Sequence, residues 1–577
     1  MRSMTGHKPW LESYPKDVPM SLAPYPEISA WAMLEDAAER HADKPSLAWF
    51  GRHMSYGWLK GETERFSAVL AGLGVGKGDR VGVILPNSPQ YVIAYYATVR
   101  LGAVIVGNNP LYSQRELSHQ LSYAGCEVVV VLDQLWDGLA AVLGEVKLRE
   151  IVVTGLEDYM SFPKNVLAPR LVFKKHAKAE GKPWPPVPRG SPVKRWKVLM
   201  KSAGAPPAAA EVDAKRDPAG FIYTGGTTGL SKGAMLSHFN IVANAMQSAA
   251  WFIDIEDGAE SMMCVLPFFH SYWMTVGMNL GILKAAKLVL LPRFELARAL
   301  EAIEKEKVTL FPGVPRIYIA LNESPKTKEH DLSSIKFCLS GAAPLPLAVA
   351  QKFHEISGRA NLVEGYGLTE TSPVAVANPL DGRAREGSIG MPLPDTDCRI
   401  VDLEDTDREV PQGERGELCI MGPQVMMGYW NKPEETAASI RDGWFLTGDI
   451  AIMDPDGFFR IVDRKKEMVI VSGFKVFPTD VEQVLYHHPK VVKACVIGVP
   501  DETTGEAVKA FVVLREGETA TPGEIIAWCK DPQSGLTGYR VPKYIEFRDA
   551  LPETLVGKVL RRVLVEEEFQ KQHAPKG

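Results

Sequence analysis

Short apolar runs alternate with segments of helical period in this chain, and that alternation restricts its fold more than any other feature. Between about residues 28 and 155, the runs 80–86 and 126–132 are apolar enough to be buried strands, and residues 91–100 have the pattern of a helix. Strands that alternate with helices favour a parallel, doubly wound sheet. The pattern resumes between about residues 218 and 380, so we predict a large α/β domain.

A loop rich in glycine and hydroxyl side chains follows Ile222 and Tyr223, which have the pattern of a strand end. Glycine backbones can turn their N–H groups toward an anion, hydroxyls add donors, and a lysine adds a mobile positive charge. The sequence contains no Gly-Lys-Ser/Thr triplet, so this is not a Walker A loop. We predict a polyphosphate site, with an ordinary surface loop as the alternative, built from Thr224, Gly225, Gly226, Thr227, Thr228, Gly229, Ser231 and Lys232.

The bulk properties bound the class of protein. At 577 residues the chain is too long for a single core. Its net charge of −5 is small for this size and favours no nucleic-acid partner. The seven cysteines are scattered without a C-x-x-C pair, which is typical of reduced thiols in a cytoplasmic protein. Neither a secretory signal nor a run of 18 apolar residues occurs, so we predict a cytoplasmic location without a membrane span.

Residues 161–201 depart from the alternating pattern. They hold eleven lysines and arginines against the single acid Glu180, and aromatic residues including Trp184 and Trp196 are interleaved with them. The prolines between 183 and 188 prevent a continuous helix. This basic segment is either a solvated excursion or a peripheral attachment to an anionic membrane surface, on the inner face of the membrane.

A short charged stretch, Asp463 to Lys466, divides the chain near its C-terminal end. Residues 457–462 before it have the pattern of a strand, and the apolar runs 468–471, 494–497 and 510–514 after it mix with helical stretches. A short charged linker suits a hinge. We predict an N-terminal domain over 1–462, a hinge over 463–468 with Asp463 and Lys466 as its key residues, and a small α+β domain over 469–577.

Further motifs follow the phosphate loop in chain order: Pro-Phe-Phe-His270, Ser-Gly-Ala-Ala-Pro344, Glu-Gly-Tyr-Gly-Leu-Thr-Glu370, Thr-Gly-Asp449 and Pro-Glu-Thr-Leu-Val-Gly-Lys558. In this order they resemble the adenylate-forming enzymes, from about residue 10 to residue 565. The closest resemblance is to bacterial long-chain fatty-acid–CoA ligases, through Glu-Gly-Tyr-Gly-Leu-Thr-Glu, Gly-Pro-Gln-Val-Met-Met-Gly-Tyr-Trp and Asp-Arg-Lys-Lys-Glu-Met-Val-Ile-Val-Ser-Gly-Phe.

The resemblance implies both a fold and an activity. The fold would be a large N-terminal domain of doubly wound sheets with a small distorted β-barrel, followed by a small mobile α+β domain. The activity would be ATP- and Mg²⁺-dependent conversion of a medium- to long-chain fatty acid to acyl-AMP, and then transfer of the acyl group to coenzyme A. The partners would be fatty acid, ATP and CoA, for a monomer or homodimer.

The resemblance also assigns roles at the nucleotide site. Glu370 would bind Mg²⁺, and a carboxylate is an oxygen ligand that suits this ion. Thr369 would donate to the α-phosphate, Tyr366 would stack on adenine, and Asp449 would accept from the ribose hydroxyls. The remaining nucleotide-binding residues would be Gly341, Ala342, Glu364, Gly365, Gly367, Ile461 and Arg464. From the residues alone, Tyr366 could equally be a core aromatic and Asp449 a turn cap.

Two further sites follow from the resemblance. His270, Trp273 and Met274 would line or gate the acyl pocket, although core packing explains these residues equally well. No general base is required, because a fatty carboxylate is already ionised at pH 7. Ser472, Gly473 and Phe474 would shape the channel for the CoA thiol. Lys558, otherwise an ordinary surface lysine, would be catalytic and would stabilise the charge of the adenylation transition state.

The same motifs are compatible with other activities. An aryl- or short-chain acid CoA ligase, or an acyl-AMP ligase that serves a carrier protein, would carry the same motifs. A non-catalytic lipid-binding relative is the alternative from another class of protein. Lys232, Glu370 and Lys558 are all present, which favours an enzyme.

Overall fold

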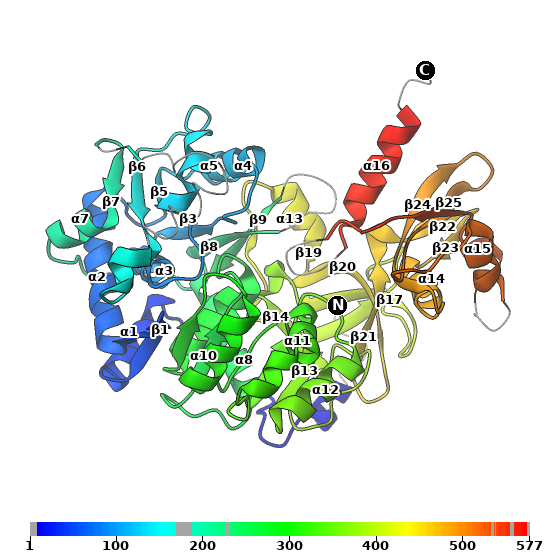
Figure 1. Ribbon diagram of the computed structural model, residues 1–577, viewed down its shortest axis with the longest axis horizontal. Coiled ribbons are helices and arrows are strands. Elements are labelled where there is room, and N and C mark those ends of the chain that lie inside the picture. Colours follow the sequence, from blue (N-terminus) through cyan, green and yellow to red (C-terminus); the bar gives the residue numbers. More distant parts are fainter. Residues whose placement is uncertain are drawn as a thin grey trace. The chain divides into compact units, whose positions relative to one another are not determined.

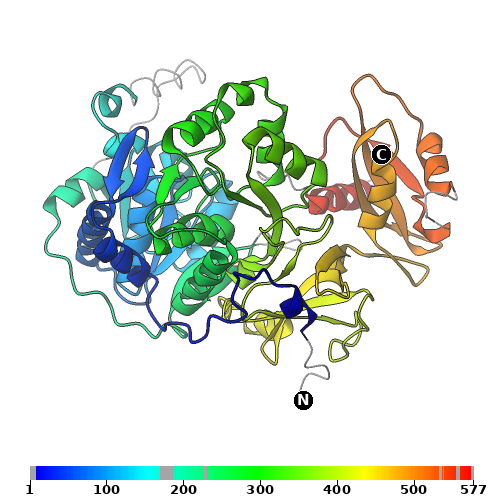
Figure 2. The ribbon, with the colours of Figure 1, turned by 90° about the horizontal axis from the view of Figure 1, so that it is seen from below.

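The computed structural model describes residues 8–168, 187–188, 190–224, 231–531, 536, 538–553 and 559–573 of the 577-residue chain. The chain packs into two compact units (Figure 1, Figure 2). The large unit comprises Tyr14–Asp397 and Met421–Gly443, and the small unit comprises Met1–Ser13, Cys398–Ile420 and Trp444–Gly577. Residues 469–577 lie in the small unit together with parts of the chain that precede residue 463. The predicted domain boundary at the hinge stays a prediction.

The main sheet of the large unit has eight strands in the order β18-β9-β8-β4-β3-β5-β6-β7. From β8 to β7 every neighbouring pair is parallel, which confirms the predicted parallel sheet. Beyond β8, the strands β9 and β18 each pair antiparallel with their neighbour. The strands are β3 (Arg80–Ile84), β4 (Val104–Gly107), β5 (Val128–Leu132), β6 (Glu150–Thr154), β7 (Val193–Arg195), β8 (Pro218–Tyr223), β9 (Gly233–Ser237) and β18 (Gly428–Tyr429).

This sheet is buried on both faces, as its continuous apolar strands require. All five residues of β5 are buried. Helices α4 and α5 share one buried apolar cluster with strands β5 and β6. The predicted helix at 91–100 is α3, buried along its whole length. The helices are α1 (Trp31–Arg40), α2 (Tyr56–Gly72), α3 (Pro89–Arg100), α4 (Gln114–Ala124), α5 (Trp136–Ala140), α7 (Trp196–Ser202), α8 (His238–Trp251), α9 (Leu280–Leu283), α10 (Leu296–Glu306), α11 (Pro315–Glu323), α12 (Leu347–Ser357) and α13 (Pro433–Ser439).

A second layer of strands completes the large unit. Its two sheets, β10-β11-β1-β2 and β12-β13-β14-β15, are joined by single bridges from Leu310 to Met262 and to Phe337. The parallel pairs β10–β11 and β12–β13 confirm the α/β pattern predicted for residues 218–380. The strands are β1 (Pro45–Trp49), β2 (Arg52–Ser55), β10 (Ser261–Cys264), β11 (Lys287–Leu290), β12 (Phe337–Ser340), β13 (Asn361–Gly367), β14 (Val374–Ala377) and β15 (Met391–Pro392).

Two further sheets are built mainly from strands of the small unit. In the first, β17 (Gly416–Met421) pairs antiparallel with β20 (Trp444–Met453), which pairs with β21 (Phe459–Arg464), while β16 (Asp397–Val401) lies beside β17. Both antiparallel pairs contain register shifts, and such bulges bend strands. This half-barrel stands where the resemblance implied a small distorted barrel.

The second sheet of the small unit confirms the predicted α+β character of residues 469–577. Its order is β23-β22-β25-β24, with β26 beside β25. The elements are β22 (Val469–Val471), β23 (Phe474–Val476), β24 (Val491–Asp501), β25 (Gly505–Leu514), β26 (Tyr544–Phe547), α14 (Pro478–Tyr486), α15 (Pro522–Lys530) and α16 (Arg561–His573). A buried apolar cluster that includes Val481, Val496 and Val512 holds α14 against the strands.

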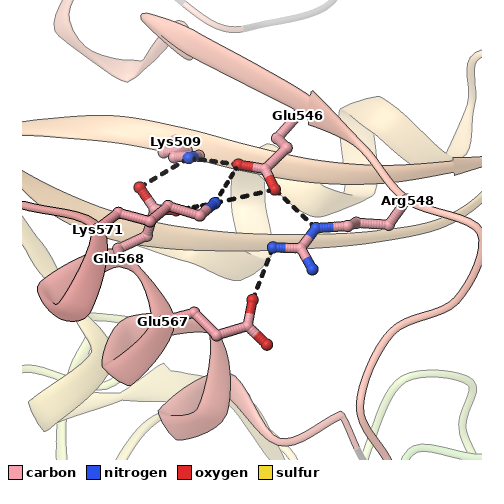
Figure 3. A network of polar contacts seen from close by, with 6 residues as sticks. All are labelled: Lys509, Glu546, Arg548, Glu567, Glu568 and Lys571. Atoms are coloured by element: carbon pink, nitrogen blue, oxygen red, sulfur yellow. Dashed lines mark hydrogen bonds and ion pairs between the residues drawn. The ribbon is translucent and has the colours of Figure 1, made fainter. Parts of the chain in front are cut away.

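Helix α16 is attached to this sheet by the buried Leu564 and by a network of charged side chains (Figure 3). Lys509 of β25 lies 2.7 Å from both Glu546 of β26 and Glu568 of α16, and Lys571 bridges the same two carboxylates. Arg548 joins Glu546 to Glu567 of the helix, at 2.7 Å from each. Burial alone would raise the pKa of Glu546, but the lysine contacts lower it to about 2. The network fixes the helix that follows the Lys558 segment.

Candidate active site

The predicted phosphate loop joins β8 to β9. Tyr223 pairs with Gly233, and the Thr224 N–H donates to the Lys232 carbonyl at 2.9 Å, so a hairpin closes the ends of the loop. Such a loop offers backbone N–H groups and side chains to an anion, without the helix N-terminus of a Walker A site. Thr224, Ser231 and Lys232 belong to the described residues. Gly225, Gly226, Thr227, Thr228 and Gly229 lie outside them, so their phosphate contacts stay predictions.

The Lys232 ammonium lies beside a carboxylate and an aromatic ring. Its Nζ is 2.5 Å from Glu435 Oε2 and 5.0 Å from the centre of the Tyr429 ring. The contact with Lys232 lowers the pKa of the Glu435 carboxyl. The two side chains are 31% and 34% exposed as a whole, while the paired oxygen Glu435 Oε2 is buried.

Glu370 lies in a tight connection after β13, at 8% exposure. Its Oε1 accepts a hydrogen bond from the Tyr429 hydroxyl at 2.7 Å. A Cβ on Gly367 would lie 1.9 Å from the Pro373 carbonyl, so only glycine allows this close chain approach. Thr369 accepts from the Ser271 hydroxyl at 3.5 Å. The structure therefore brings Lys232 to the ring of Tyr429 and Glu370 to its hydroxyl.

The next group of predicted nucleotide-binding residues lies at the ends of β12 and β13. These strands are parallel, with Ser340 opposite Glu364, so the loop after β12 lies beside β13. The Leu345 N–H donates to Glu364 Oε2 at 2.8 Å, and burial raises the pKa of the Glu364 carboxyl to about 7. Ala342 in that loop has a positive φ of 68°. Gly341, Gly365 and the half-buried Tyr366 lie in the same two segments, and adenine stacking on Tyr366 stays a prediction.

The predicted acyl-pocket residues lie where a loop enters a π-helix, Trp273–Asn279. Trp273 and Met274 are each 1% exposed, and the rings of His270 and Trp273 are 5.0 Å apart. His270 itself is exposed, although crowding by protein atoms lowers the pKa of its imidazole to about 4. The lowered pKa favours a neutral ring at pH 7. The role of this group in lining an acyl pocket stays a prediction.

In the small unit, Asp449 and Arg464 form a cross-strand pair. They stand opposite each other on β20 and β21, with Arg464 Nε 2.9 Å from Asp449 Oδ1. Asp449 is 3% exposed. The alternative that Asp449 caps a turn is wrong, because Gly448, with φ +71°, forms a bulge within strand β20. Ile461 is half-buried on β21, so all three predicted residues share two strands.

The predicted hinge is less exposed than its charges suggested. Strand β21 continues through Asp463 to Arg464, and a short 3₁₀ turn follows at Lys465–Glu467. Asp463 is 4% exposed and accepts from the Arg464 and Thr479 N–H groups at 2.7 and 2.8 Å. Burial raises the pKa of its carboxyl to about 6. Lys466 is exposed, so it is the residue of this segment that solvent reaches most freely.

The predicted CoA-channel residues form the turn between β22 and β23. Ser472 and Gly473 have φ values of 51° and 83°, as a two-residue hairpin turn of type I′ requires. The Ser472 N–H donates to the Thr504 carbonyl at 2.8 Å. Phe474 is 56% exposed and stacks on Tyr539 at 4.7 Å. Lys558 lies outside the described residues.

The carboxylate of Glu370 suits a metal ion that is bound partly by substrate phosphates, rather than one that is bound by protein side chains alone. No group of three or more His, Cys, Asp or Glu side chains in the described part of the chain could hold a metal ion. Glu370 is a single carboxylate beside the phosphate loop, and Mg²⁺ commonly binds one or two carboxylates, substrate phosphates and waters. The seven cysteines are buried and form no disulfide, and burial raises the pKa of thiols such as Cys264 and Cys338.

The structure corrects one expectation for the basic segment 161–201. Trp196 does not face a membrane: it is 1% exposed, stacks on Phe66 at 4.0 Å and donates to the Tyr159 hydroxyl at 3.0 Å. Lys194 and Lys197 are paired with Glu150 and Asp158. Residues 169–186 and 189, which include Trp184, lie outside the described chain. Within the described residues, no helix is both long and apolar enough to cross a bilayer.

Sequence reasoning missed Tyr429 and Glu435, which contact Lys232 directly. Tyr429 belongs to the Gly-Tyr-Trp end of a motif that carried the resemblance, and Glu435 lies a few residues farther on. Their distance along the chain from both Lys232 and Glu370 hid their place in the site. Sequence reasoning also missed Asn87. Its buried side-chain amide donates to the Leu266 carbonyl and accepts from the Phe268 N–H, and it thereby holds the loop before His270.

Comparison with known proteins adds independent evidence. Residues 34–430 match the AMP-binding enzyme family, and residues 480–558 match the AMP-binding enzyme C-terminal domain. The chain is 44% identical to a long-chain-fatty-acid–CoA ligase of Bacillus subtilis (strain 168), over 99% of this chain and 100% of the relative. A Yersinia pestis protein of the same name is 40% identical, over 98% of each chain. The crystal structure of ATP-bound MatB from Rhodopseudomonas palustris is 29% identical, with a TM-score of 0.79 over 94% of this chain and 99% of that one.

Proposed function

The chain belongs to the AMP-binding enzyme family, and on that premise we propose that it activates a fatty acid with ATP and transfers the acyl group to coenzyme A. The observation that carries the proposal is the arrangement of Lys232, Tyr429 and Glu370 beside the glycine-rich loop. It offers a cation and a carboxylate to the phosphates of one nucleotide. The near full-length relatives named long-chain-fatty-acid–CoA ligases support a fatty acid as the substrate.

The reaction proceeds in two half-reactions. In the first, a fatty carboxylate oxygen attacks the α-phosphorus of ATP, the bond to the bridging oxygen breaks, and pyrophosphate leaves. In the second, the CoA sulfur attacks the acyl carbonyl carbon, the mixed anhydride breaks, and AMP leaves. The nucleophilic sulfur belongs to CoA, so the buried cysteines of the chain need not react.

The protein contributes position and charge. Both reactants of the first step are anionic, so fixed cations and donors lower the barrier more than a base would. Lys232 and the loop 224–231 hold the terminal phosphates, and Thr369 donates near the α-phosphate. Glu370 is the residue that would hold Mg²⁺, which when bound would neutralise phosphate charge. Asp449 accepts from the ribose, and Arg464 keeps that carboxylate in place.

The two half-reactions use the C-terminal segment differently. Lys558 stabilises the adenylation transition state. Rotation about the Asp463–Lys466 hinge then withdraws Lys558 and presents the turn Ser472–Gly473–Phe474 to the adenylate, where it lines the thiol path. The exposure of Lys466 and of Phe474 is compatible with segments that change surroundings.

The same chemistry suits a location in the cytoplasm, where ATP, CoA and reduced thiols occur together. Peripheral contact with an anionic membrane would bring the enzyme close to fatty acids. The parts of segment 161–201 that support this contact are the exposed Phe162 and Val198, at 81% and 63% exposure. The paired Lys194 and Lys197 contribute less, because carboxylates already neutralise them.

The adenylation step can be tested without CoA. A fatty acid should stimulate exchange of labelled pyrophosphate into ATP in the presence of Mg²⁺, because the first half-reaction is reversible. Exchange that is absent with every fatty acid would contradict the proposal. Exchange that an aromatic or short-chain acid supports better would instead favour the aryl- or short-chain ligase alternative.

A further inference from the structure

One short segment of the large unit contacts both halves of the candidate phosphate site. The Met426 N–H donates to the Glu370 carbonyl at 2.8 Å, and the Trp430 N–H donates to the Gly233 carbonyl, directly after Lys232, at 2.9 Å. Strand β18 between them pairs with β9. Residues 426–430 therefore form a physical link between the lysine and the carboxylate.

Tyr429 is the side chain at the centre of this link. Its hydroxyl donates to Glu370 Oε1 at 2.7 Å, and its ring lies 5.0 Å from the Lys232 ammonium. Tyr429 is only 7% exposed. A hydrogen bond to a charged carboxylate and a cation over an aromatic face are both stronger in such a partly desolvated place.

The backbone around Tyr429 is itself fixed by α13. Its N–H donates to Thr436 Oγ1 at 2.9 Å, and a Cβ on Gly428 would lie 2.5 Å from Thr436 Cγ2. Glu435 precedes Thr436 directly, so the clamp that orients Tyr429 also places the Glu435 carboxylate against Lys232. Glu435 has a second cation nearby, Lys432, at 3.1 Å.

We propose that Tyr429 and Glu435 set the affinity of this site for magnesium–ATP from opposite directions. Tyr429 is a positioning residue that holds the Glu370 carboxylate and the Lys232 ammonium ready for a metal-bound triphosphate. Glu435 is the resident counter-ion of Lys232, and the triphosphate displaces it. The inference rests on the proposed function for the identity of the ligand as ATP.

The exchange at Lys232 is physically reasonable. A third of each partner is exposed, and ion pairs of this kind contribute little net stability. A triphosphate carries several negative charges and offers more acceptor oxygens than one carboxylate. The phosphate groups therefore displace Glu435 from Lys232. Because the Glu435 contact is lost on binding, the net affinity for the triphosphate is lower than it would be without Glu435.

Equilibrium calorimetry separates the two roles, with ATP titrated into the full chain without fatty acid, once with excess Mg²⁺ and once with EDTA. Tyr429→Phe keeps the ring but removes the hydroxyl, so it should weaken magnesium–ATP binding about tenfold and leave metal-free ATP nearly unchanged. Glu435→Gln should tighten binding about three- to fivefold under both conditions. Glu434→Gln removes the same charge from the exposed neighbouring position of α13 and should change neither.

A double variant tests whether Tyr429 acts through Glu370. In a Glu370→Gln background, Tyr429→Phe should cause no further loss of the magnesium-dependent affinity. An additional tenfold loss there, or a Tyr429→Phe loss that is equal with and without Mg²⁺, would overturn the positioning role. Weaker binding by Glu435→Gln, or no change, would overturn the counter-ion role.

Two controls keep these outcomes interpretable. The thermal unfolding midpoints of Tyr429→Phe and Glu435→Gln should match that of the wild type, and an affinity change is scored only for a variant that passes. If Tyr429→Phe fails, Tyr429→Met replaces it, because Met is no larger than Tyr and carries no donor; it is scored on the difference between the Mg²⁺ and EDTA titrations. Wild-type protein that binds no ATP would contradict the proposed function itself. Wild-type binding with unchanged variants would contradict only this inference.

Discussion

Arg464 Nε lies 2.9 Å from Asp449 Oδ1, across the neighbouring strands β20 and β21. The arginine is 35% exposed whereas the aspartate is 4% exposed in its side chain, so the pair presents a buried carboxylate whose orientation is set from the solvent side. A carboxylate held in this way is a fixed acceptor for paired hydroxyl donors, such as those of a ribose.

Asp449→Asn should therefore raise the KM for ATP by about 10- to 100-fold, because a hydrogen bond to a charged group contributes about 1.5–3 kcal/mol. Steady-state kinetics with varied ATP measures this change. Asp407→Asn, at an exposed position of the same unit, is the matched control and should leave the KM unchanged. An unaltered KM in Asp449→Asn would show that the pair serves only the fold.

The Glu364 carboxyl gives the large unit a specific pH dependence. Burial raises its pKa from 4.5 to about 7, so the folded state binds this proton more tightly than the unfolded state does. Its effect on stability is thus a penalty that grows as the pH rises from about 4.5 to about 7 and is complete above that range.

Glu364→Gln removes the charge and keeps an acceptor for the Leu345 N–H. The variant should be more stable than the wild type at pH 8, by about 3 kcal/mol at most, and nearly equal to it at pH 5. Thermal unfolding at the two pH values measures the difference. Glu355→Gln on the exposed side of α12 should show no such pH-dependent gain, and a gain of equal size at pH 5 would contradict the assignment to Glu364.

Lys558→Ala should abolish acyl-AMP formation but leave thioester formation from pre-made acyl-AMP largely intact. Loss of a group that stabilises charge in a transition state commonly costs about 10²–10³ in rate. The two half-reactions can be assayed separately, with Lys530→Ala, an exposed lysine at the end of α15, as the control. An equal fall in both half-reactions would make Lys558 structural and would remove the basis for the hinge rotation.

Some of the fold and site could be predicted because the signals are local. The strand at 80–86 and the helix at 91–100 are β3 and α3, since unbroken apolar runs and helical period each specify an element directly. Glu370 and Lys232 stand in short motifs, and the structure brings both against Tyr429. The chemistry of these residues is readable from neighbours a few positions away.

Other features depend on contacts between distant segments, which no local pattern records. Tyr429 reaches Glu370 from 59 positions away, and Glu435 reaches Lys232 from the far end of the same unit. The interleaved tryptophans of 161–201 suggested an amphipathic surface, but Trp196 is buried because Phe66 and Tyr159 of other segments enclose it. Asp449 does not cap a turn, because the pairing of β20 with β17 and β21 keeps this segment in a strand, and Gly448 forms a bulge within it.

The burial of Trp196 and the pairing of two lysines define which residues to replace in a membrane test of the basic segment 161–201. Glutamine should replace its lysines and arginines except Lys194 and Lys197, which are paired with acids, and Trp196 should be kept. Each basic residue near an anionic surface contributes about 1 kcal/mol, so the variant should sediment less with anionic vesicles at low salt. Its activity on a soluble acid should not change. Absent binding by the wild type, or equal binding by the variant, would make the segment a solvated excursion.

The central claim is that this chain joins a fatty acid to CoA through an adenylate. A panel of acids from C2 to C20, together with aromatic acids, should be assayed for AMP release with and without CoA. The account predicts sustained AMP release only when CoA is present, with medium- or long-chain fatty acids as the best substrates. Sustained release that ignores CoA, or a maximum with aromatic or short-chain acids, would contradict it.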